Sequence, residues 1–312
     1  MPGMTAAPEA PPRGATRAHA PSCAWCGSLG RPVAARLLVC DACGAATTYP
    51  PPDDAELEAA YSGWYRPAAG RFAGGGDRLL RRSRATLARR LDERAPAGPV
   101  LDVGCGEGAL LDALHARGRE AVGLERNSSR SDVRAREVTE FGERAGEWAA
   151  IVFWHSLEHL REPAAALERA SELLRPGGLL VVAIPNRASW QARLLGPRWF
   201  GLDVPRHLVH LPAWAVVEFL RSRGLRIERV SYWRGGQVMF GWLQGVVGAL
   251  PGRPDLYDAI RQPDARSREL GPARRIATVA AGVVLAPVAF ALAVAEVSAR
   301  AGGTVYLEAR RP

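Results

Sequence analysis

The stretch that decides the fold is "PVLDVGCGEGALLDALHARG", residues 99–118. Residues 100–103 form a short apolar run typical of a buried strand, residues 104–108 form a glycine-rich turn, and residues 109–117 show the apolar spacing of a helix. Glycine is needed where a ligand presses against a backbone that has no room for a Cβ atom. The order of strand, glycine-rich turn and helix therefore predicts an α/β domain with a ligand site at the turn.

Two acidic residues accompany this turn. Asp102 stands directly before it and can hold an ammonium group or order the loop. About twenty residues further on, the run "AVGLER" predicts a second strand ending in Glu125, which is placed to accept hydrogen bonds from both hydroxyls of a ribose. The glycine spacing is GxGxG, with one acid before the turn and another at the end of the next strand.

This pattern resembles the class I S-adenosylmethionine-dependent methyltransferases, and the resemblance continues in order along the chain. "EWAAIVFWHSLEHLREP" is similar to the family's fourth strand and the loop after it, and "AAALERASELLRPGGLLVVAIPN" to the next helix, turn and fifth strand. "LDVPRHLVHL" resembles a subgroup close to ubiquinone-type O-methyltransferases, in which an N-terminal cysteine ribbon is also common. The alternative is a nicotinamide-binding Rossmann domain, which would require a phosphate-facing GxGxxG and a different second half.

The resemblance implies an α/β fold with a Rossmann-like, seven-stranded, mostly parallel sheet whose last strand is antiparallel. A small N-terminal zinc ribbon and a helical insert before the last strand complete the expected architecture. The expected segments are a disordered leader (1–22), the zinc ribbon (23–49), a linker and basic helix (50–95), the methyltransferase core (96–234), an apolar helical insert (235–302) and the last strand of the core (303–312).

The resemblance also implies a set of cofactor-binding residues. The glycines should line the amino-acid end and ribose of S-adenosylmethionine, with Cys105 as a small filler, while the end of the fourth strand should border the sulfonium and methyl group. Because only 25 residues separate Glu125 from Ile151, we expect the first of the two intervening helices to be reduced to a turn. The residues expected at the cofactor are Asp102, Gly104, Cys105, Gly106, Gly108, Glu125, Glu137, Phe153, Trp154 and His155, with Glu137 as the candidate for the adenine amino group.

Histidines are the candidates for the chemistry. Methyl transfer from a sulfonium needs an aligned nucleophile and, for an oxygen acceptor, a base that removes its proton. We expect His155 or His207 to be that base. The alternative for Glu158 and His159 is a structural role at a helix start. The resemblance also suggests a divalent cation in this loop, but His155 replaces one of the acids that it would need.

Four of the five cysteines form two CxxC pairs, "CAWCG" and "CDACG". Two such knuckles complete a closed tetrahedral S4 site, which suits a structural zinc ion. The alternatives are two disulfides or a redox CxxC. The first does not suit a reducing cytosol, and the second does not explain two pairs. The expected zinc ligands are Cys23, Cys26, Cys40 and Cys43.

Composition bounds the rest of the function. All 41 basic residues are arginine and the formal charge is +9, so the absence of lysine excludes Schiff-base chemistry through a lysine. The chain shows no fingerprint of a nucleic-acid module, and we expect no nucleic-acid partner. Residues 1–22 are rich in proline and alanine without an apolar core, which indicates a disordered leader and a cytoplasmic protein.

The run "IATVAAGVVLAPVAFALAVA", residues 276–295, contains no charge. It lies in an insert of about seventy residues before the last strand, which is long for a connection inside a domain. Either the insert is a helical pair packed on the enzyme or in a dimer, or it is a hairpin that enters one leaflet of a membrane and returns. The hairpin would place Trp242 and six arginines near the headgroups: Arg253, Arg261, Arg266, Arg268, Arg274 and Arg275.

We therefore expect a methyltransferase that O-methylates a lipid-soluble or other small-molecule acceptor, in the cytoplasm or peripherally on the inner face of the membrane. The alternative from another class is a non-catalytic scaffold that keeps the methyltransferase shape and binds partners through the ribbon and insert. The identity of the acceptor and the oligomeric state stay open.

Overall fold

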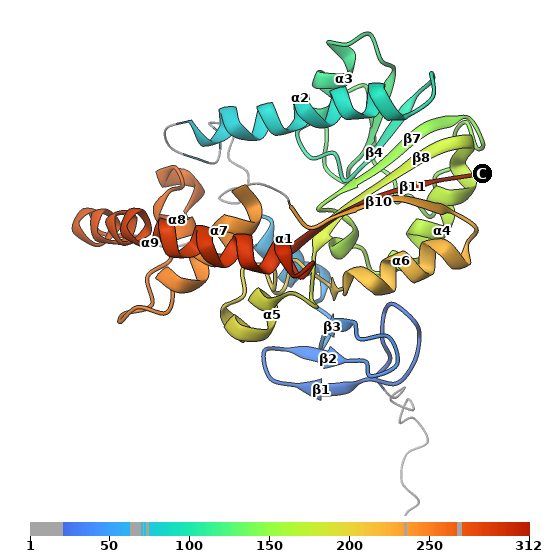
Figure 1. Ribbon diagram of the computed structural model, residues 1–312. Helices are drawn as coiled ribbons and strands as arrows, with labels where there is room; N and C mark the ends of the chain where they lie inside the picture. The colour runs from blue at the N-terminus through green and yellow to red at the C-terminus, as the bar shows by residue number, and fades with distance from the viewer. Residues whose placement is uncertain (1–20, 63–69, 71, 73–74, 234–235, 267–269) are drawn as a thin grey trace, which may run out of the picture.

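A seven-stranded sheet forms the centre of the computed structural model, which describes residues 21–62, 70, 72, 75–233, 236–266 and 270–312 (Figure 1). Its spatial order is β10-β11-β8-β7-β4-β5-β6. In chain order the strands are β4 (Val100–Val103), β5 (Ala121–Leu124), β6 (Val133–Arg134), β7 (Trp148–Trp154), β8 (Leu174–Pro185), β10 (Arg226–Ser231) and β11 (Thr304–Arg310).

The strand directions confirm the expected fold class. Strands β4 to β8 pair in parallel, whereas β11 lies between β8 and β10 and runs antiparallel to both. The chain proceeds outward from β4 to β5 and β6 on one side, and to β7 and β8 on the other. Strand β4 therefore lies at the point where the strand order reverses, and the carboxyl ends of such strands are where an open α/β sheet binds its ligand.

Helices cover both faces of the sheet, and alternate strand residues point to opposite faces. Val100 and Val152 pack with α2 (Gly76–Arg94) and α3 (Ala109–His115) above the sheet in Figure 1. Leu101 and Ile151 pack below it, on the side of α4 (Pro163–Leu173) and α6 (Ala213–Ser222). One arginine of α2 attaches the helix to the sheet. Arg90 makes a two-pronged ion pair with the buried Glu308 of β11, at 2.8 and 2.9 Å.

The cysteine-rich segment packs directly on the sheet domain. Strands β1 (Arg31–Val33), β2 (Leu37–Val39) and β3 (Ala46–Thr48) form an antiparallel sheet that β9 (Val209–His210) extends, since Ala46 pairs with His210. The Trp25 ring lies 5.0 Å from that of Phe219 on α6. Helix α1 (Asp54–Ala60) follows the ribbon. The ribbon is therefore held by strand pairing as well as by aromatic contact.

The insert between β10 and β11 is helical and is anchored at its base. It contains α7 (Gly236–Val247), α8 (Leu256–Ala259), the 3-10 turn Pro263–Ala265 and α9 (Pro272–Ser298). The buried Glu296 of α9 accepts hydrogen bonds from the backbone N–H of Gln191 at 2.9 Å, from Trp242 Nε1 at 3.0 Å and from the backbone N–H of Gly303 at 3.2 Å. Gln191 belongs to α5 (Trp190–Leu195). One carboxylate thus joins α5, α7, α9 and the start of β11.

Two expectations for the insert were wrong. Trp242 does not lie at a surface, because it is 3% exposed and its indole N–H is paired with Glu296 in the small core between α7 and α9. Arg261 is also buried, with its guanidinium over the Tyr257 ring. Arg253 and Arg274 are exposed as expected, and Arg266 and Arg275 are partly exposed. Arg268 lies outside the described residues.

The connections on the β6 side of the sheet contain less helix than expected. We predicted that one helix between Glu125 and Ile151 would shrink to a turn. All the residues from 125 to 147 are described, and neither the connection from β5 to β6 nor that from β6 to β7 contains a helix. The loops that follow β7 and β8 carry short 3-10 turns, Leu157–His159 and Gly196–Arg198.

Candidate active site

The glycine-rich turn follows β4 at the switch point of the sheet. Gly104, Gly106 and Gly108 all adopt positive φ values, of 74°, 60° and 82°, a conformation that glycine adopts without strain. A Cβ atom on Gly104 would lie 2.5 Å from the Cβ of Ser156, and one on Gly108 would lie 2.8 Å from the Arg130 guanidinium. Gly104 is therefore packed against the loop after β7 and Gly108 against the loop after β5, and a side chain at either position would collide with its neighbour.

Glu125 lies at the end of β5 and is tied to this turn. The backbone N–H of Gly106 donates to Glu125 Oε2 at 2.9 Å, and that of Arg126 donates to Oε1 at 3.1 Å. These bonds hold the carboxylate beside the glycines, where it can accept hydrogen bonds from a diol. The structure thus brings together the two features that the sequence placed twenty residues apart along the chain.

Asp102, the last acidic residue before the turn, is buried in the sheet. Burial raises its pKa to about 7, with Arg84 of α2 opposing the rise and Glu125 adding to it. A cationic ligand beside Asp102 would stabilise the charged form. Cys105 is unsuited to nucleophilic chemistry, because burial and the nearby Asp102 and Glu125 carboxylates raise the pKa of its thiol to about 12.

The other predicted cofactor residues differ in their surroundings. Phe153 is fully buried in the core below the sheet. Trp154 faces the α2 side, where the Arg84 guanidinium lies 4.7 Å from the centre of its ring. Glu137 is on the loop after β6 and forms a surface ion pair of 2.7 Å with Arg126. Phe153 therefore supports the strand from below.

Sequence reasoning missed Arg130, which closes the open side of the turn. Its guanidinium makes ion pairs of 2.8 Å with both Asp112 of α3 and Asp132. It also lies against the backbone of Gly108. The residue occupies the loop that replaces the missing helix. No local signal in "NSSRSD" indicates this contact, because it depends on how the loop after β5 folds back over α3.

His155 stands at the carboxyl end of β7 beside the glycine turn. Its φ of 54° is unusual for a residue other than glycine, and such strained positions cluster at functional sites. Its neighbour Ser156 donates to the carbonyl of Val103 and packs on Gly104. His155 Nδ1 lies 3.3 Å from Glu158 Oε1, and Nε2 lies 3.0 Å from the side-chain nitrogen of Gln237, on the first turn of α7.

Glu158 is the buried centre of a histidine cluster. Burial would raise its pKa, but the hydrogen bond from His155 and the neighbouring His155, His207 and His159 imidazoles outweigh it and lower the pKa to about 2. Its Oε2 atom has no hydrogen-bond partner in the described part of the chain. Glu158 therefore stays ionised, and its Oε1 can accept the Nδ1–H of His155.

His207 and His210 are buried, whereas His159 is partly exposed, as His155 is. His207 Nδ1 lies 2.9 Å from the Gly201 carbonyl oxygen, and its Nε2 lies 4.0 Å from Glu158 Oε1. Burial and His207 lower the pKa of His159 to about 4, and with Arg187 they lower that of His210 to about 3. Ligand atoms of Glu158, His159 and His207 lie within 4.8 Å of one another. His155 is the more exposed of the two candidate bases, at 23% of its side chain against 11% for His207.

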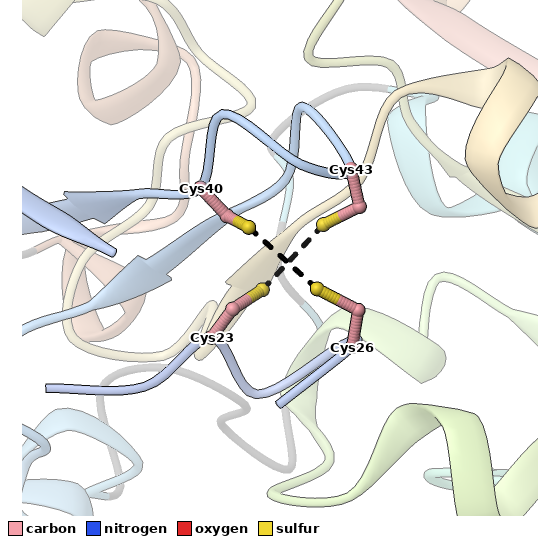
Figure 2. Close-up of side chains that lie close together, drawn as sticks. All are labelled: Cys23, Cys26, Cys40 and Cys43. Atoms are coloured by element: carbon pink, nitrogen blue, oxygen red, sulfur yellow. Dashed lines mark hydrogen bonds between the residues drawn. The ribbon is translucent and has the colours of Figure 1, made fainter. Parts of the chain in front are cut away.

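The four ribbon cysteines converge from two knuckles, as Figure 2 shows. The Sγ atoms of Cys23 and Cys43, and those of Cys26 and Cys40, lie 3.6 Å apart, and all four lie within 4.8 Å of one another. A zinc ion bound at about 2.3 Å by four sulfurs requires sulfur separations of about 3.8 Å. All four cysteines are free thiols in the structure. The arrangement thus has the size of a closed S4 site.

The pKa values of the clustered thiols are shifted in different directions. Burial raises the pKa of Cys23 and of Cys43. Burial also opposes ionisation of Cys26, but hydrogen bonds from Ser28 lower its pKa to about 7. Four clustered thiols in this environment cannot all ionise without a compensating cation, and a bound dication supplies that charge.

Comparison with known proteins agrees with this geometry. Residues 75–230, half of the chain, match the family model described as a methyltransferase domain. A ubiquinone biosynthesis O-methyltransferase of Xanthomonas axonopodis is 29% identical over 163 residues, which cover 44% of this chain and 66% of that relative. A probable S-adenosylmethionine-dependent methyltransferase of Mycolicibacterium smegmatis is 28% identical over 152 residues, or 45% of this chain and 56% of the relative.

Among solved structures, a Burkholderia thailandensis 1,6-didemethyltoxoflavin-N1-methyltransferase overlaps 90% of this chain and 98% of its own, with 13% identity and a TM-score of 0.46. The chain spans just under two thirds of the length of the Xanthomonas relative. The fold and site define a class I S-adenosylmethionine-dependent methyltransferase domain. By its match to the family model, the chain belongs to the methyltransferase domain family.

The residues present fit S-adenosylmethionine at the switch point. The turn offers glycine backbone without Cβ atoms, Glu125 offers two carboxylate oxygens for a ribose, and Asp102 offers a buried acid for an ammonium group. The fit is weakest at the adenine, because the family's helices are missing there and Glu137 is engaged by Arg126.

Proposed function

We propose that the protein transfers the methyl group of S-adenosylmethionine to an oxygen of a small or lipid-soluble acceptor. The observation that carries the proposal is the juxtaposition, at one edge of the sheet, of the glycine turn with Glu125 and of His155 with the ionised Glu158. The first pair suits the cofactor and the second suits removal of a proton. The similarity to ubiquinone biosynthesis O-methyltransferases, over part of the chain, supports oxygen as the acceptor atom.

When bound, S-adenosylmethionine supplies an activated methyl group, so the protein's task is alignment and proton removal. The Glu158 carboxylate accepts the Nδ1–H of His155, which leaves the lone pair on Nε2. Nε2 would take the proton of the acceptor hydroxyl. S-adenosylmethionine would supply the methyl group, whose bond to sulfur breaks, leaving the electron pair on sulfur, as its bond to the acceptor oxygen forms. The resulting imidazolium lies beside the Glu158 carboxylate, which stabilises its charge.

The exposed face of α9 supports a lipid-soluble acceptor and a peripheral place on the membrane. Within the described residues α9 is the one helix long and apolar enough to cross a membrane, as judged by length and composition alone. Its outward residues include Ile276 and Val283, each 70% exposed, and Val284, 75% exposed. An exposed apolar face of this kind marks an interaction surface. The guanidinium groups of Arg253 and Arg274 near its start suit anionic headgroups.

A lying rather than a spanning helix fits the topology. The strands that enter and leave the insert, β10 and β11, pair with each other in the central sheet. Both ends of the insert are therefore on one side of any membrane, and a single crossing by α9 is not compatible with that pairing. The protein accordingly works from the cytoplasmic side, with α9 in the headgroup region.

The ribbon is proposed to hold one structural zinc ion through Cys23, Cys26, Cys40 and Cys43. Four protein ligands leave no open position, so the ion would fix the ribbon and take no part in methyl transfer. Because β3 pairs with β9, the ion would also stabilise the loop that carries His207 and His210.

A second candidate is a non-catalytic scaffold that binds partners through the ribbon and insert. The missing helices between β5 and β7 favour it, because they leave the adenine end of the site poorly walled. A scaffold need not bind S-adenosylmethionine, so a direct binding titration separates the two candidates.

The proposal is tested by incubating the full-length protein with methyl-labelled S-adenosylmethionine and a membrane-lipid extract, followed by identification of the labelled product. We expect a labelled methyl ether. His155→Ala should abolish most of the labelling while S-adenosylmethionine still binds. If binding and labelling fall together, or if neither changes, His155 is not the base.

A further inference from the structure

Within the described residues, Gln237 is the side chain of the insert that contacts the candidate base. Gln237, on the first turn of α7, lies with its Nε2 atom 3.0 Å and its Oε1 atom 3.3 Å from His155 Nε2. In the tautomer that the proposed function requires, the buried Glu158 carboxylate takes the Nδ1–H of His155, and Nε2 carries the lone pair and accepts. In that tautomer the Gln237 amide N–H is the donor to Nε2.

This hydrogen bond conflicts with the proposed chemistry. A neutral imidazole has one lone pair in the ring plane, on the nitrogen without a hydrogen. In the described structure the Gln237 amide takes that lone pair, so His155 cannot also accept a proton from an acceptor hydroxyl. Gln237 is exposed on α7, and its side chain can swing away without disturbing the buried contacts of Val238 and Trp242.

We propose that Gln237 occupies the place of the acceptor hydroxyl on His155, and that the acceptor must displace it to be methylated. This inference rests on the proposed function and deepens it by locating the acceptor site. The acceptor lies between the end of β7 and the first turn of α7, so that the insert forms one wall of the site. The acceptor group is a neutral hydroxyl, because it must donate a hydrogen bond to Nε2 as the Gln237 amide does.

The location also links the site to the exposed apolar helix. α7 packs against α9, and Glu296 joins the two helices to the start of β11. An acceptor bound between β7 and α7 therefore lies against the helical pair whose other member, α9, carries the exposed apolar residues. This geometry favours a hydroxyl borne on an apolar molecule, such as a phenol with a hydrocarbon tail.

The test measures access to His155 Nε2 without relying on turnover. Diethyl pyrocarbonate acylates an unprotonated imidazole nitrogen with a free lone pair. Its rate at His155 is followed by peptide mass spectrometry and normalised to His115, whose side chain is 41% exposed on α3. The proteins are the full-length wild type, Gln237→Ala, Gln237→Glu and the control Gln244→Ala. Gln244 is on the same helix and bonds within the insert, to Asp255 and Tyr257.

We expect Gln237→Ala to raise the acylation rate at His155 by roughly two- to tenfold, the factor that corresponds to the loss of one ordinary hydrogen bond. Gln237→Glu should lower it, because carboxylates on both ring nitrogens hold His155 as the imidazolium. Gln244→Ala should leave it unchanged. Equal acceleration by Gln237→Ala and Gln244→Ala would reflect general loosening of the insert and overturn the proposal, as would no change in either Gln237 variant.

A second readout separates acceptor competition from catalysis. With labelled S-adenosylmethionine, the amount of lipid extract that gives half-maximal methylation should fall in Gln237→Ala by a similar factor. A rise in that amount would mean that Gln237 binds the acceptor and would contradict displacement. S-adenosylmethionine binding is titrated on the same preparations. If none of the proteins binds S-adenosylmethionine, the proposed function is refuted. The acylation rates would still show whether Gln237 covers His155 Nε2.

Discussion

Glu158 Oε1 lies 3.3 Å from His155 Nδ1, inside a protein core where Glu158 is only 3% exposed. Glu158→Gln keeps the shape of the side chain but removes the charge that holds the Nδ1–H and stabilises the imidazolium. We expect methyl transfer to fall on the order of 100-fold, with S-adenosylmethionine affinity unchanged. Glu162→Gln, at an exposed position in the same loop, is the control. A Glu158→Gln protein that keeps full activity would exclude the pair as the base.

Asp102 gives a prediction for stability against pH. Burial raises its pKa to about 7 from an ordinary value of 3.8. For an acid with a raised pKa the folded state binds the extra proton, so the ligand-free protein should lose stability as the pH rises from about 4 to 7. Asp102→Asn removes this loss and should stabilise the ligand-free protein at pH 8 by up to about 4 kcal/mol. Urea unfolding at pH 5 and pH 8 measures it.

The same substitution should weaken S-adenosylmethionine binding, because the ammonium group loses its buried counter-charge. If the Asp102→Asn protein is more stable but binds S-adenosylmethionine more weakly, Asp102 is a binding residue whose burial destabilises the ligand-free protein. The stability gain of Asp102→Asn over the wild type should be larger at pH 8 than at pH 5. An equal gain at both pH values would show that burial does not raise the pKa of Asp102.

The ribbon should contain one zinc ion per chain. Cys43→Ser removes one of four ligands, and we expect loss of the metal together with a decrease of about 5–10 °C in Tm, because the ribbon sheet includes β9 of the main domain. Cys105→Ser, outside the cluster, should keep the metal. Metal analysis of freshly reduced protein and thermal unfolding are the measurements. Full-length protein without any bound metal would remove the zinc assignment.

The outward face of α9 should bind anionic vesicles. Val283→Asp with Val284→Asp places two charges on side chains that are 70% and 75% exposed, so the fold is unaffected while insertion into the headgroup region becomes costly. We expect co-sedimentation with vesicles to weaken by about tenfold or more. Leu29→Asp changes an equally exposed apolar residue, 71% exposed on the ribbon, and should have no effect. Wild-type protein that stays in solution would favour a purely soluble insert.

The position of Glu125 beside the glycine turn was predictable from local spacing in the sequence. The turn from Gly104 to Gly108 and the acid at Glu125 are separated by one helix, and parallel pairing of β4 with β5 brings them to the same edge. The antiparallel direction of β11 was predicted from the family resemblance and not from local spacing. His155 was a candidate because it ends a strand that pairs with β4.

What could not be predicted depends on packing between distant segments. Gln237 contacts His155, which is 82 positions away in the sequence. The sequence of the helix that carries Gln237 does not indicate which side chain it contacts. Trp242 was expected at a surface because an apolar run does not reveal which of its faces has a partner. Trp242 is buried because its indole bonds to Glu296. Glu296 also bonds to Gln191 and Gly303, and these partners come from three separate parts of the chain.

The most direct test of the central claim is a calorimetric titration of the full-length protein with S-adenosylmethionine, repeated with Glu125→Ala and Glu137→Ala. We expect one site in the wild type. Loss of two charge-assisted hydrogen bonds to the ribose in Glu125→Ala should weaken binding roughly 100-fold, whereas Glu137→Ala, which alters only a surface ion pair with Arg126, should bind nearly as the wild type does. A wild-type protein that takes up no S-adenosylmethionine, or a Glu125→Ala protein that binds it equally well, would contradict the assignment.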